Sequence, residues 1–433
     1  MNNEVENMKR MYKYSVFLGT FILRIYEISL NKDLFIPFFI SNFMDPSQSI
    51  RGIKSDLLKN KKIVYGITGS VSAEESVKIT RELIRHGAEV FPVMTDDATS
   101  LITDVSIEYA TGKKPIIKVS GLTEHVLLEK DSDLLLIAPC SANTIGKIAC
   151  GIADTSVSLF ALTFLGSKKI LIAPAMSMSM YNNPIVKENI QKLEKHGVKF
   201  INPKFEEGKA KLPSVETIVA YAIREIQGIK NKRVAIIGGK SEEDIDDVRV
   251  ITNKSSGKTS IELAKVAFYL GFDVTLYMGI SEESIPEYIN TKHYRKVEDL
   301  INKVEEFLNY DIVIVPAALS DFSVDKIEGK IQSNSEITLK LKPLPKFLKI
   351  LSEKYNGVLI GFKAEVGYNN VINEAKEMID KYKLRFVVGN DIREVERDKT
   401  KVLIIEKDKI DELSGDKFNV ALEIFRRYIS KIL

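Results

Sequence analysis

The sequence predicts an α/β protein with two doubly wound domains, each built on a mainly parallel sheet. From Lys61 onward, short apolar runs alternate with helix-like segments, which is typical of parallel strands joined by helical crossovers. The alternation stops in a short polar stretch near residue 230 and then begins again. The chain has 433 residues, more than one ordinary core accommodates, so we expect two or three domains.

Short apolar runs place the strands of the first domain at residues 62–67, 88–94, 133–138 and 169–174. After the first of these, Ser72 and Glu75 have the spacing of a capping box. We therefore expect a helix with Ser72 at its N-cap and an end at Gly87. Parallel strands present their carboxyl ends at one edge of the sheet, where ligands bind.

Further strands are expected at residues 233–237, 274–278, 311–315, 358–362, 385–388 and 402–405. One helix is expected to end at Gly271, and another to begin near Phe418. The chain then divides into an N-terminal extension, a first domain, a linker and a second domain, with bounds 1–43, 44–225, 226–232 and 233–433.

The N-terminal extension is apolar from Tyr14 to Phe43, but charged residues interrupt it. No run reaches the roughly 18 apolar residues that a membrane span needs. The segment also lacks the small-residue cleavage site of a signal peptide. We expect a mis-called start ahead of a natural one at Met44; an amphipathic accessory segment is the alternative.

The composition describes a soluble globular chain, with 45% hydrophobic and 28% charged residues. The 62 basic and 59 acidic residues leave a formal net charge of +3, so we expect neither a nucleic-acid partner nor a membrane partner. Two cysteines, Cys140 and Cys150, exclude a disulfide scaffold and a four-cysteine zinc site. A reducing, cytoplasmic setting is the expectation.

Polar turns follow each strand of the first domain. Free backbone N–H groups and hydroxyls in such turns suit a single phosphate, because the three-glycine fingerprint of dinucleotide sites is absent. The candidate residues at these strand ends are Gly69, Ser70, Thr95, Ser141, Asn143, Thr144 and Met176.

The four histidines differ in their surroundings. His86 and His196 each precede a glycine at a helix end, where an imidazolium would complement the helix dipole. His293 lies in a polar stretch without a partner motif. His125 precedes the strand that ends in Ala-Pro-Cys-Ser-Ala-Asn-Thr, and this combination makes it the candidate catalytic residue.

Together these motifs resemble the flavin-containing cysteine decarboxylases over roughly residues 60–220. The resemblance implies a flavodoxin- or Rossmann-like domain that binds FMN through the strand-end residues named above. It also implies that His125 is the catalytic base and that Asn143 lies in the flavin and substrate site.

Two positions depart from this family. Ser177 stands where the family has an asparagine that clamps the substrate carboxylate, and the flap at residues 204–212 lacks the family's cysteine. Cys140 either approaches the flavin or is a small core residue. The alternative to decarboxylation is an inactive or regulatory flavin domain that acts as a binding module.

The second domain carries an ordered set of motifs. Asn253 precedes a Ser-Ser-Gly-Lys turn that predicts a triphosphate cradle before a capped helix, although it is not a Walker A sequence. A generic nucleotide-binding module is one reading. By their resemblance to a family of nucleotide-activated ligases, these motifs imply as nucleotide-site residues Ser255, Ser256, Gly257, Lys258, Ala317, Ala318, Asp321, Lys330, Leu344, Pro345, Lys346, Phe347, Phe362, Lys376 and Lys381.

This set resembles the phosphopantothenate–cysteine ligases, whose bacterial members use CTP. The resemblance implies that Asp321 and the Ala317–Ala318 backbone recognise cytidine, while Phe362, Lys376 and Lys381 complete the nucleotide site. Lys330 would neutralise charge as the carboxylate of 4′-phosphopantothenate attacks the α-phosphate. Asn253 would hold the acyl-cytidylate for attack by L-cysteine. Mg²⁺ or Mn²⁺ would bridge the triphosphate. The sequence leaves CTP against another nucleotide open.

From residue 44 onward, the chain therefore resembles the bifunctional phosphopantothenoylcysteine decarboxylase and phosphopantothenate–cysteine ligase family of coenzyme A biosynthesis. The product implied is 4′-phosphopantetheine. The family also implies a homo-oligomer, with flavin-domain trimers and ligase-domain dimers.

Overall fold

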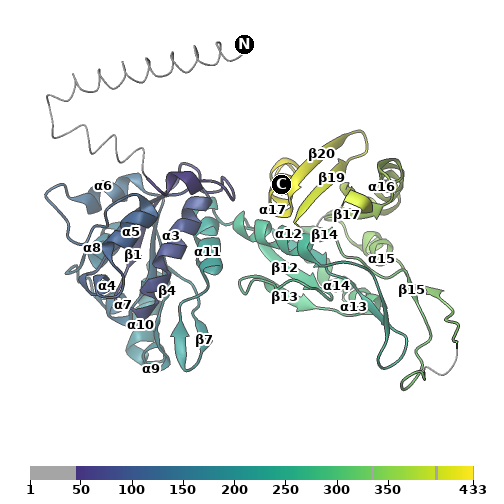
Figure 1. Cartoon of the computed structure of the whole chain (residues 1–433), viewed down its shortest axis with the longest axis horizontal. Helices are drawn as coiled ribbons and strands as arrows, with labels where there is room; N and C mark the ends of the chain where they lie inside the picture. Colours follow the sequence, from purple (N-terminus) through teal and green to yellow (C-terminus); the bar gives the residue numbers. More distant parts are fainter. Residues whose placement is uncertain (1–44, 333–335, 395–397, 433) are drawn as a thin grey trace, which may run out of the picture.

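The computed structural model describes residues 45–332, 336–394 and 398–432 (Figure 1). The predicted extension at residues 1–43 lies outside this part of the chain. The first half forms a five-stranded parallel sheet in the order β2-β1-β3-β4-β6. Its strands are β1 (Lys62–Ile67), β2 (Glu89–Met94), β3 (Leu134–Cys140), β4 (Lys169–Pro174) and β6 (Lys199–Phe200).

Helices cover both faces of this sheet because alternate strand residues point to opposite sides. Along β1, Tyr65 packs into one buried cluster and Val64 into the other. The helices and helical turns of this half are η1 (Gln48–Ile50), η2 (Val71–Glu75), α3 (Ser76–Arg85), α4 (Asp96–Thr99), α5 (Asp104–Thr111), α6 (Glu124–Asp131), α7 (Ala142–Ala149), α8 (Ser156–Phe164), α9 (Met178–Tyr181), α10 (Pro184–Lys195) and α11 (Val215–Gln227).

The second half forms an eight-stranded sheet in the order β13-β12-β9-β14-β17-β18-β19-β20. Pairing is parallel through β18, and β19 and β20 are antiparallel. Its strands are β9 (Arg233–Gly238), β12 (Asp273–Met278), β13 (Asn290–His293), β14 (Ile312–Val315), β17 (Val358–Glu365), β18 (Phe386–Asp391), β19 (Lys399–Ile405) and β20 (Ile410–Asp416). Two α/β domains with mainly parallel sheets are therefore confirmed.

Helices also flank the second sheet. They are α12 (Lys258–Tyr269), α13 (Val297–Asn302), α14 (Val304–Phe307), α15 (Phe347–Lys354), α16 (Tyr368–Tyr382), η3 (Ile392–Glu394), α17 (Lys417–Ile424) and a final turn, η4 (Phe425–Ile429). Among the described residues, no helix combines the length and apolar character needed to cross a membrane.

Three small sheets project from the main ones, and the sequence did not predict them because their strands are too short for a periodic pattern. They are β5 (Met176–Ser177) with β8 (Lys209–Lys211) and β7 (Lys204–Glu206), β10 (Glu242–Asp244) with β11 (Val250–Thr252), and β15 (Phe322–Ser323) with β16 (Lys342–Pro343).

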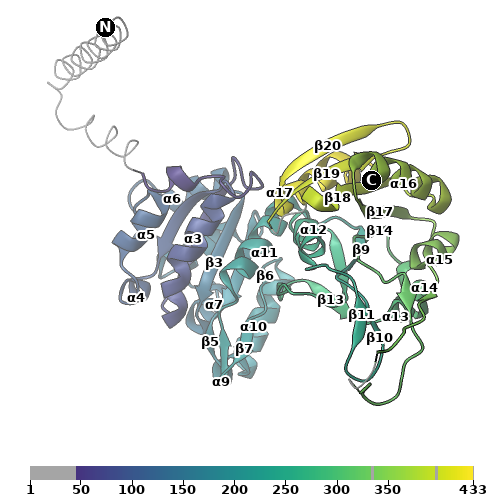
Figure 2. The same ribbon diagram turned by 45° about the vertical axis from the view of Figure 1, so that its right-hand side comes forward.

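Helix α11 joins the two halves, lying between α3 and α12 (Figure 2). Arg224 donates from one guanidinium nitrogen to the carbonyls of Phe268 (3.0 Å) and Phe272 (2.6 Å). Its charged group also lies 4.6 Å from the Phe268 ring centroid. One apolar cluster continues from Leu58 of the first half to Phe425 of the second. The halves therefore share part of one core.

The predicted helix start at Ser72 is wrong. Residues 71–75 form the tight turn η2, and α3 begins at Ser76 with Glu75 at the N-cap and no side-chain cap. The turn keeps Ala73 fully buried, with its amide bonded to the Ser70 carbonyl at 2.8 Å. Core packing therefore overrides the capping pattern.

The predicted imidazolium at His86 is also wrong. His86 is 5% exposed, its Nδ1 lies 2.7 Å from Ser55 Oγ, and its ring meets Tyr269 and Phe418 edge-on. Burial lowers the pKa of His86 to about 4, and nearby Glu82 opposes this only in part. At neutral pH the ring is uncharged and part of the contact between the halves.

We predict that His86 weakens the protein in acid. Unfolded histidine binds a proton near pH 6.5, whereas folded His86 binds one only near pH 4. The free energy of unfolding should therefore fall by on the order of 2 to 3 kcal/mol as pH drops across this window. Denaturant titrations at several pH values should show that the free energy of unfolding falls less steeply with decreasing pH in His86→Asn than in the wild type. The control, His196→Asn at an exposed helix end, should keep the wild-type dependence of unfolding free energy on pH. The same pH dependence in the wild type and both variants would contradict the prediction.

Candidate active sites

Thr68 ties together the turns that follow β1 and β3. Its hydroxyl donates to the Pro139 carbonyl (2.9 Å) and accepts from the Ser141 amide (2.9 Å). Thr68 is fully buried, so these bonds form away from competing water. The result is that Ser70 and Ser141, which are far apart in sequence, meet at one edge of the sheet. Sequence reasoning missed Thr68 because its role lies entirely in these distant contacts.

The predicted flavin-site residues fall into two groups. Ser141 accepts from the Thr144 amide (3.3 Å) and caps α7, while Thr95 accepts from the Ala98 amide (3.3 Å) and caps α4. Within the described residues, the side chains of Ser70 and Asn143 make no hydrogen bond, and Asn143 is exposed. Ser70 and Asn143 are therefore the polar groups that a ligand can use directly.

Gly69 is required by close approach. A Cβ atom at this position would lie 2.6 Å from the Cβ of Asp97, closer than carbon atoms tolerate. The turn after β1 therefore packs against the first turn of α4. Only a glycine lets the backbone amides of this turn come so close to the neighbouring strand end.

Met176 joins the same edge through backbone pairing. The Ala175 amide donates to the Cys140 carbonyl (3.0 Å), and Met176 pairs with Ala210 in the flap hairpin formed by β7 and β8. The flap, which lacks a cysteine, is therefore joined to this edge of the sheet through β5. Cys140 does not replace that cysteine: it is fully buried in the core, and burial raises the pKa of its thiol.

His125 is not brought to Asn143 within one chain. It lies on α6, which leads into the amino end of β3, whereas Asn143 follows the carboxyl end (Figures 1 and 2). Its ring contacts Phe160 edge-on at 6.3 Å, and its Nδ1 is buried without a hydrogen-bond partner in the described structure. Within a single chain, the candidate base is therefore separated from the other candidate groups.

A second site forms where β9, β14 and β11 end. Asn253 donates through its amide nitrogen to the carbonyls of Ala318 (3.2 Å) and Leu319 (2.9 Å). The Ala318 amide in turn donates to the Gly239 carbonyl (2.9 Å). Two of the predicted residues thus meet directly. The backbone groups of Ala318 already form hydrogen bonds within the protein. The backbone of its neighbour Ala317 is therefore the one available to a nucleobase.

The predicted cradle before α12 is present, but without a side-chain cap. Gly257 holds the N-cap position at φ +81°, and a Cβ there would lie 2.4 Å from Met278 Cε. The Lys258 amide donates to Ser256 Oγ (3.4 Å), and the amides of Ser260 and Ile261 donate to the Gly257 carbonyl. Among the described residues, the Thr259 amide is therefore the one at this helix start that an anion can use. Lys258 pairs with Asp398, Ser256 binds Ser281 through its carbonyl, and Ser255 makes no hydrogen bond among the described residues.

The remaining predicted residues are not equivalent. Asp321 pairs with Lys346, and its carbonyl accepts from the Leu344 amide (2.9 Å), which keeps Leu344 and Pro345 beside it. The Phe347 side chain is buried in the core, so its ring packs inside the domain and does not face this corner. Phe362 is half-buried, and Lys330 is exposed with no bond to its side chain in the described structure.

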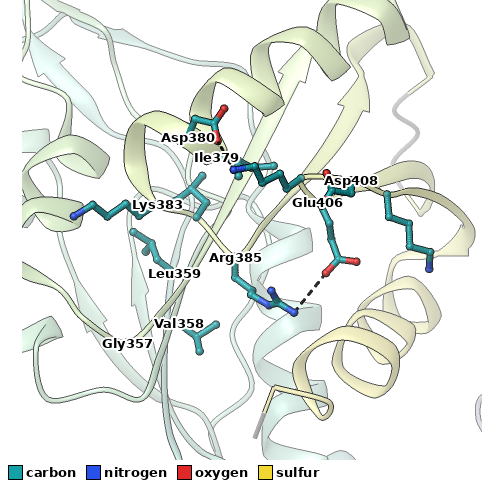
Figure 3. A pocket seen from close by; sticks show the side chains of 12 residues that line it. Gly357, Val358, Leu359, Ile379, Asp380, Lys383, Arg385, Glu406 and Asp408 are labelled. Atoms are coloured by element: carbon teal, nitrogen blue, oxygen red, sulfur yellow. Dashed lines mark ion pairs between the residues drawn. The ribbon is translucent and has the colours of Figure 1, made fainter.

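Lys376 and Lys381 lie apart from this corner. Both are exposed on α16, which carries the chain back towards the amino ends of β17 and β18. Beside Lys381, a cavity of about 640 Å³ opens at those amino ends (Figure 3). Ion pairs between Arg385 and Glu406 and between Lys407 and Asp380 cross its mouth. This cavity is at the opposite edge from Asn253, so the single chain does not place Lys381 in the nucleotide site.

Comparisons with known proteins agree with the two halves. The flavoprotein family model matches residues 51–227, and the model for the C-terminal domain of DNA/pantothenate metabolism flavoproteins matches residues 229–432. The chain is 42% identical to the coenzyme A biosynthesis bifunctional protein CoaBC of Thermococcus kodakarensis, over 83% of this chain and 92% of that one.

The protein of the same name from Methanocaldococcus jannaschii is 41% identical, over 91% of this chain and 98% of that one. The chain belongs to the CoaBC family of bifunctional coenzyme A biosynthesis enzymes. A solved C-terminal domain of a CoaBC protein is 29% identical, covers 47% of this chain and 97% of its own, and superposes with a TM-score of 0.41.

The CoaBC family therefore supplies a flavoprotein decarboxylase half and a ligase half, as the sequence predicted. In the described residues, no three or more histidine, cysteine, aspartate or glutamate side chains gather in a way that could hold an ion.

We predict that Gly69→Ala weakens flavin binding. The new methyl group collides with Asp97, and relieving the collision shifts the turn at a cost of about 1 to 3 kcal/mol. Flavin affinity should fall roughly tenfold to a hundredfold, measured by fluorescence titration of the apoprotein. Gly121→Ala, where the added atom meets open space, is the matched control. Unchanged affinity in Gly69→Ala would exclude this turn from the flavin site.

Proposed function

We propose that the chain carries out two successive reactions of coenzyme A biosynthesis. The second domain joins 4′-phosphopantothenate to L-cysteine with CTP, and the first decarboxylates the product to 4′-phosphopantetheine. Two separate strand-end sites, each in a half matched by its own family model, carry this proposal. We divide the chain at the proposed bounds 44–225, 226–232 and 233–433.

The ligase step needs charge stabilisation at phosphorus. The carboxylate of 4′-phosphopantothenate attacks the α-phosphate of CTP, pyrophosphate leaves, and the amine of L-cysteine then displaces CMP to form the amide. We assign Lys330 to the charge that develops in the first step. Asn253 donates its amide hydrogens to Ala318 and Leu319, and we assign its carboxamide oxygen, which no described group engages, to the second step. We assign Asp321 and the Ala317 backbone to recognition of the cytosine base of CTP.

The metal is proposed to enter with the nucleotide. Mg²⁺ or Mn²⁺ is commonly held by one or two carboxylates together with substrate phosphates, rather than by a protein cage. The absence of a three-ligand cluster among the described residues fits this mode.

The flavin half fits FMN. The Gly69 amide and the Ser70 hydroxyl have no hydrogen-bond partner among the described residues and suit a single phosphate. Exposed Asn143 is free to contact the substrate or the ring. When bound, FMN supplies the two-electron oxidation of the substrate CH₂–SH group and later returns the electrons, so that charge left by CO₂ loss spreads onto sulfur. His125, with an unbonded ring nitrogen, is assigned to remove the proton.

The decarboxylase site is proposed to be completed by a second copy of the chain. Exposed apolar side chains lie on and beside the helix that carries His125, namely Leu122, Val126 and Leu127. Exposed apolar groups favour association, and α6 lies away from α7, the helix that carries Asn143 (Figures 1 and 2). We therefore propose a homo-oligomer in which His125 of one copy serves the site of the next.

A ligase with an inactive flavin domain is the competing function, since the flap lacks a cysteine. Incubation with 4′-phosphopantothenate, L-cysteine and CTP, followed by mass spectrometry, distinguishes the two. We expect 4′-phosphopantetheine; accumulation of phosphopantothenoylcysteine would support the competing function. A cytoplasmic location remains our expectation, based on the low cysteine content.

We predict that His125→Asn abolishes CO₂ release and leaves ligation intact. Asparagine keeps a polar side chain of similar size but cannot take up the proton, and loss of a general base typically costs about 10² to 10⁴ in rate. CO₂ release from supplied phosphopantothenoylcysteine is the measurement. His196→Asn is the control and should behave as wild type. Undiminished CO₂ release would remove His125 from the site.

We predict that Lys330→Gln slows acyl-cytidylate formation. One well-placed charge is worth on the order of 3 kcal/mol in a transition state, so pyrophosphate release should slow roughly a hundredfold. The assay uses CTP and 4′-phosphopantothenate without cysteine. Lys340→Gln, an exposed lysine of the same connection, is the control. If pyrophosphate release is normal in Lys330→Gln, this lysine is only a solvated loop residue.

A further inference from the structure

Strands β10 and β11 form a hairpin (Figure 2). The turn between them carries a buried carboxylate, Asp246. Asp246 is 1% exposed, although it lies in a surface hairpin. One carboxylate oxygen accepts from the amides of Val248 (2.8 Å) and Arg249 (2.6 Å). The other accepts from the Arg249 guanidinium (2.5 Å) and from the amide of Ile331 (3.0 Å).

The bond to Ile331 reaches a different part of the chain. Ile331 follows Lys330 directly, and the residue on the other side, Gly329, is also held by this turn. Asp247 accepts from the Gly329 amide (3.0 Å) and donates its own amide to the Gly329 carbonyl (3.2 Å). The two peptide neighbours of Lys330 are thus fixed, while the lysine side chain itself remains exposed.

The same turn also leads into the other candidate catalytic residue of the ligase. Strand β11 ends at Thr252, and Asn253 comes next. Asp246 therefore sits between the backbone that carries Asn253 and the backbone that carries Lys330. The bonds from Val248 and Arg249 to Asp246 stabilise the hairpin itself. The bond from Ile331 instead joins the hairpin to the connection that carries Lys330.

Charge makes this arrangement rigid. Burial by itself would raise the pKa of Asp246, but the amides of Ile331, Val248 and Arg249 and the Arg249 guanidinium more than compensate and hold it well below its usual range. The side chain is thus a carboxylate at all working pH values. Charge-assisted bonds of this kind are stronger than neutral ones, and an unpaired buried donor is costly.

We propose that Asp246 is the positioning residue for Lys330, setting its distance from Asn253 and from the reacting phosphate. The inference rests on the proposed role of Lys330 in acyl-cytidylate formation. Asp246 touches no substrate in this arrangement. It acts only through the backbone of residues 329–331.

The test is a double-mutant cycle on pyrophosphate release from CTP and 4′-phosphopantothenate. In Asp246→Asn, an NH₂ group replaces one of the two carboxylate oxygens, each of which accepts from two donors. The hydrogen bonds to that oxygen are lost while the side chain keeps its size. Displacing a catalytic group by about an ångström costs up to a hundredfold, so we expect a loss on the order of tenfold to a hundredfold in kcat, with a smaller change in KM for CTP. In the Lys330→Gln background, Asp246→Asn should change the rate less than about twofold.

The same factor of loss in both backgrounds would overturn the proposal, because Asp246 would then act independently of Lys330. A wild-type rate in Lys330→Gln alone would instead contradict the proposed function of that lysine. Asp325→Asn removes an exposed ion pair with Lys342 on the same connection and should keep the wild-type rate.

If Asp246→Asn fails to fold, Asp247→Ala provides the second test. Asp247 is largely exposed and holds Gly329 on the other side of Lys330. This variant should slow pyrophosphate release severalfold, again only when Lys330 is present. The thermal unfolding transition of each variant, compared with that of the wild type, reports whether the second half remains folded, because CO₂ release reports on the first half. An Asp247→Ala variant with an unchanged rate would overturn the proposal.

Discussion

Parallel pairing imposes one constraint on both halves of this chain, because all such strands end at the same edge of their sheet. The backbone groups beyond that edge have lost their partners in the sheet and must find others or bind a ligand. In the first half, the Thr68 hydroxyl satisfies two of these groups and leaves Ser70 and Asn143 unused. In the second half, the Asn253 carboxamide has the corresponding position between strand ends.

The sequence predicted the strands that are long and apolar, and β1 coincides with its predicted residues 62–67. It did not predict β13 or β20, since polar residues fill these outer strands and no apolar run marks them. The Ser72 cap failed because burial of Ala73 outweighs a local hydrogen-bond pattern. Hydrophobic periodicity predicts which face of an element is buried. It does not predict where a 3₁₀ turn replaces the first turn of a helix.

The motifs identified polar strand-end residues where the hydrogen-bonding group lies in the motif itself: Ser141 caps α7, and Asn253 bonds the backbone beyond β14. Thr68 and Asp246 were missed because their partners, Pro139 and Ile331, are 71 and 85 residues away. Phe347 was placed in the nucleotide site because it belongs to a motif, yet its ring serves the core. A motif therefore identifies a neighbourhood, and the direction of each side chain requires the fold.

The shared core at α11 has a consequence for how this protein can be divided. Arg224 satisfies carbonyls at Phe268 and Phe272, and the apolar cluster runs without a break from Leu58 to Phe425. A cut near residue 228 would leave unsatisfied carbonyls and bare aromatic rings on one fragment and a stranded guanidinium on the other. Separate genes for the two activities would each need new polar residues at this seam to remain soluble. The buried contacts of α11 therefore hold the two halves together more than the peptide link does.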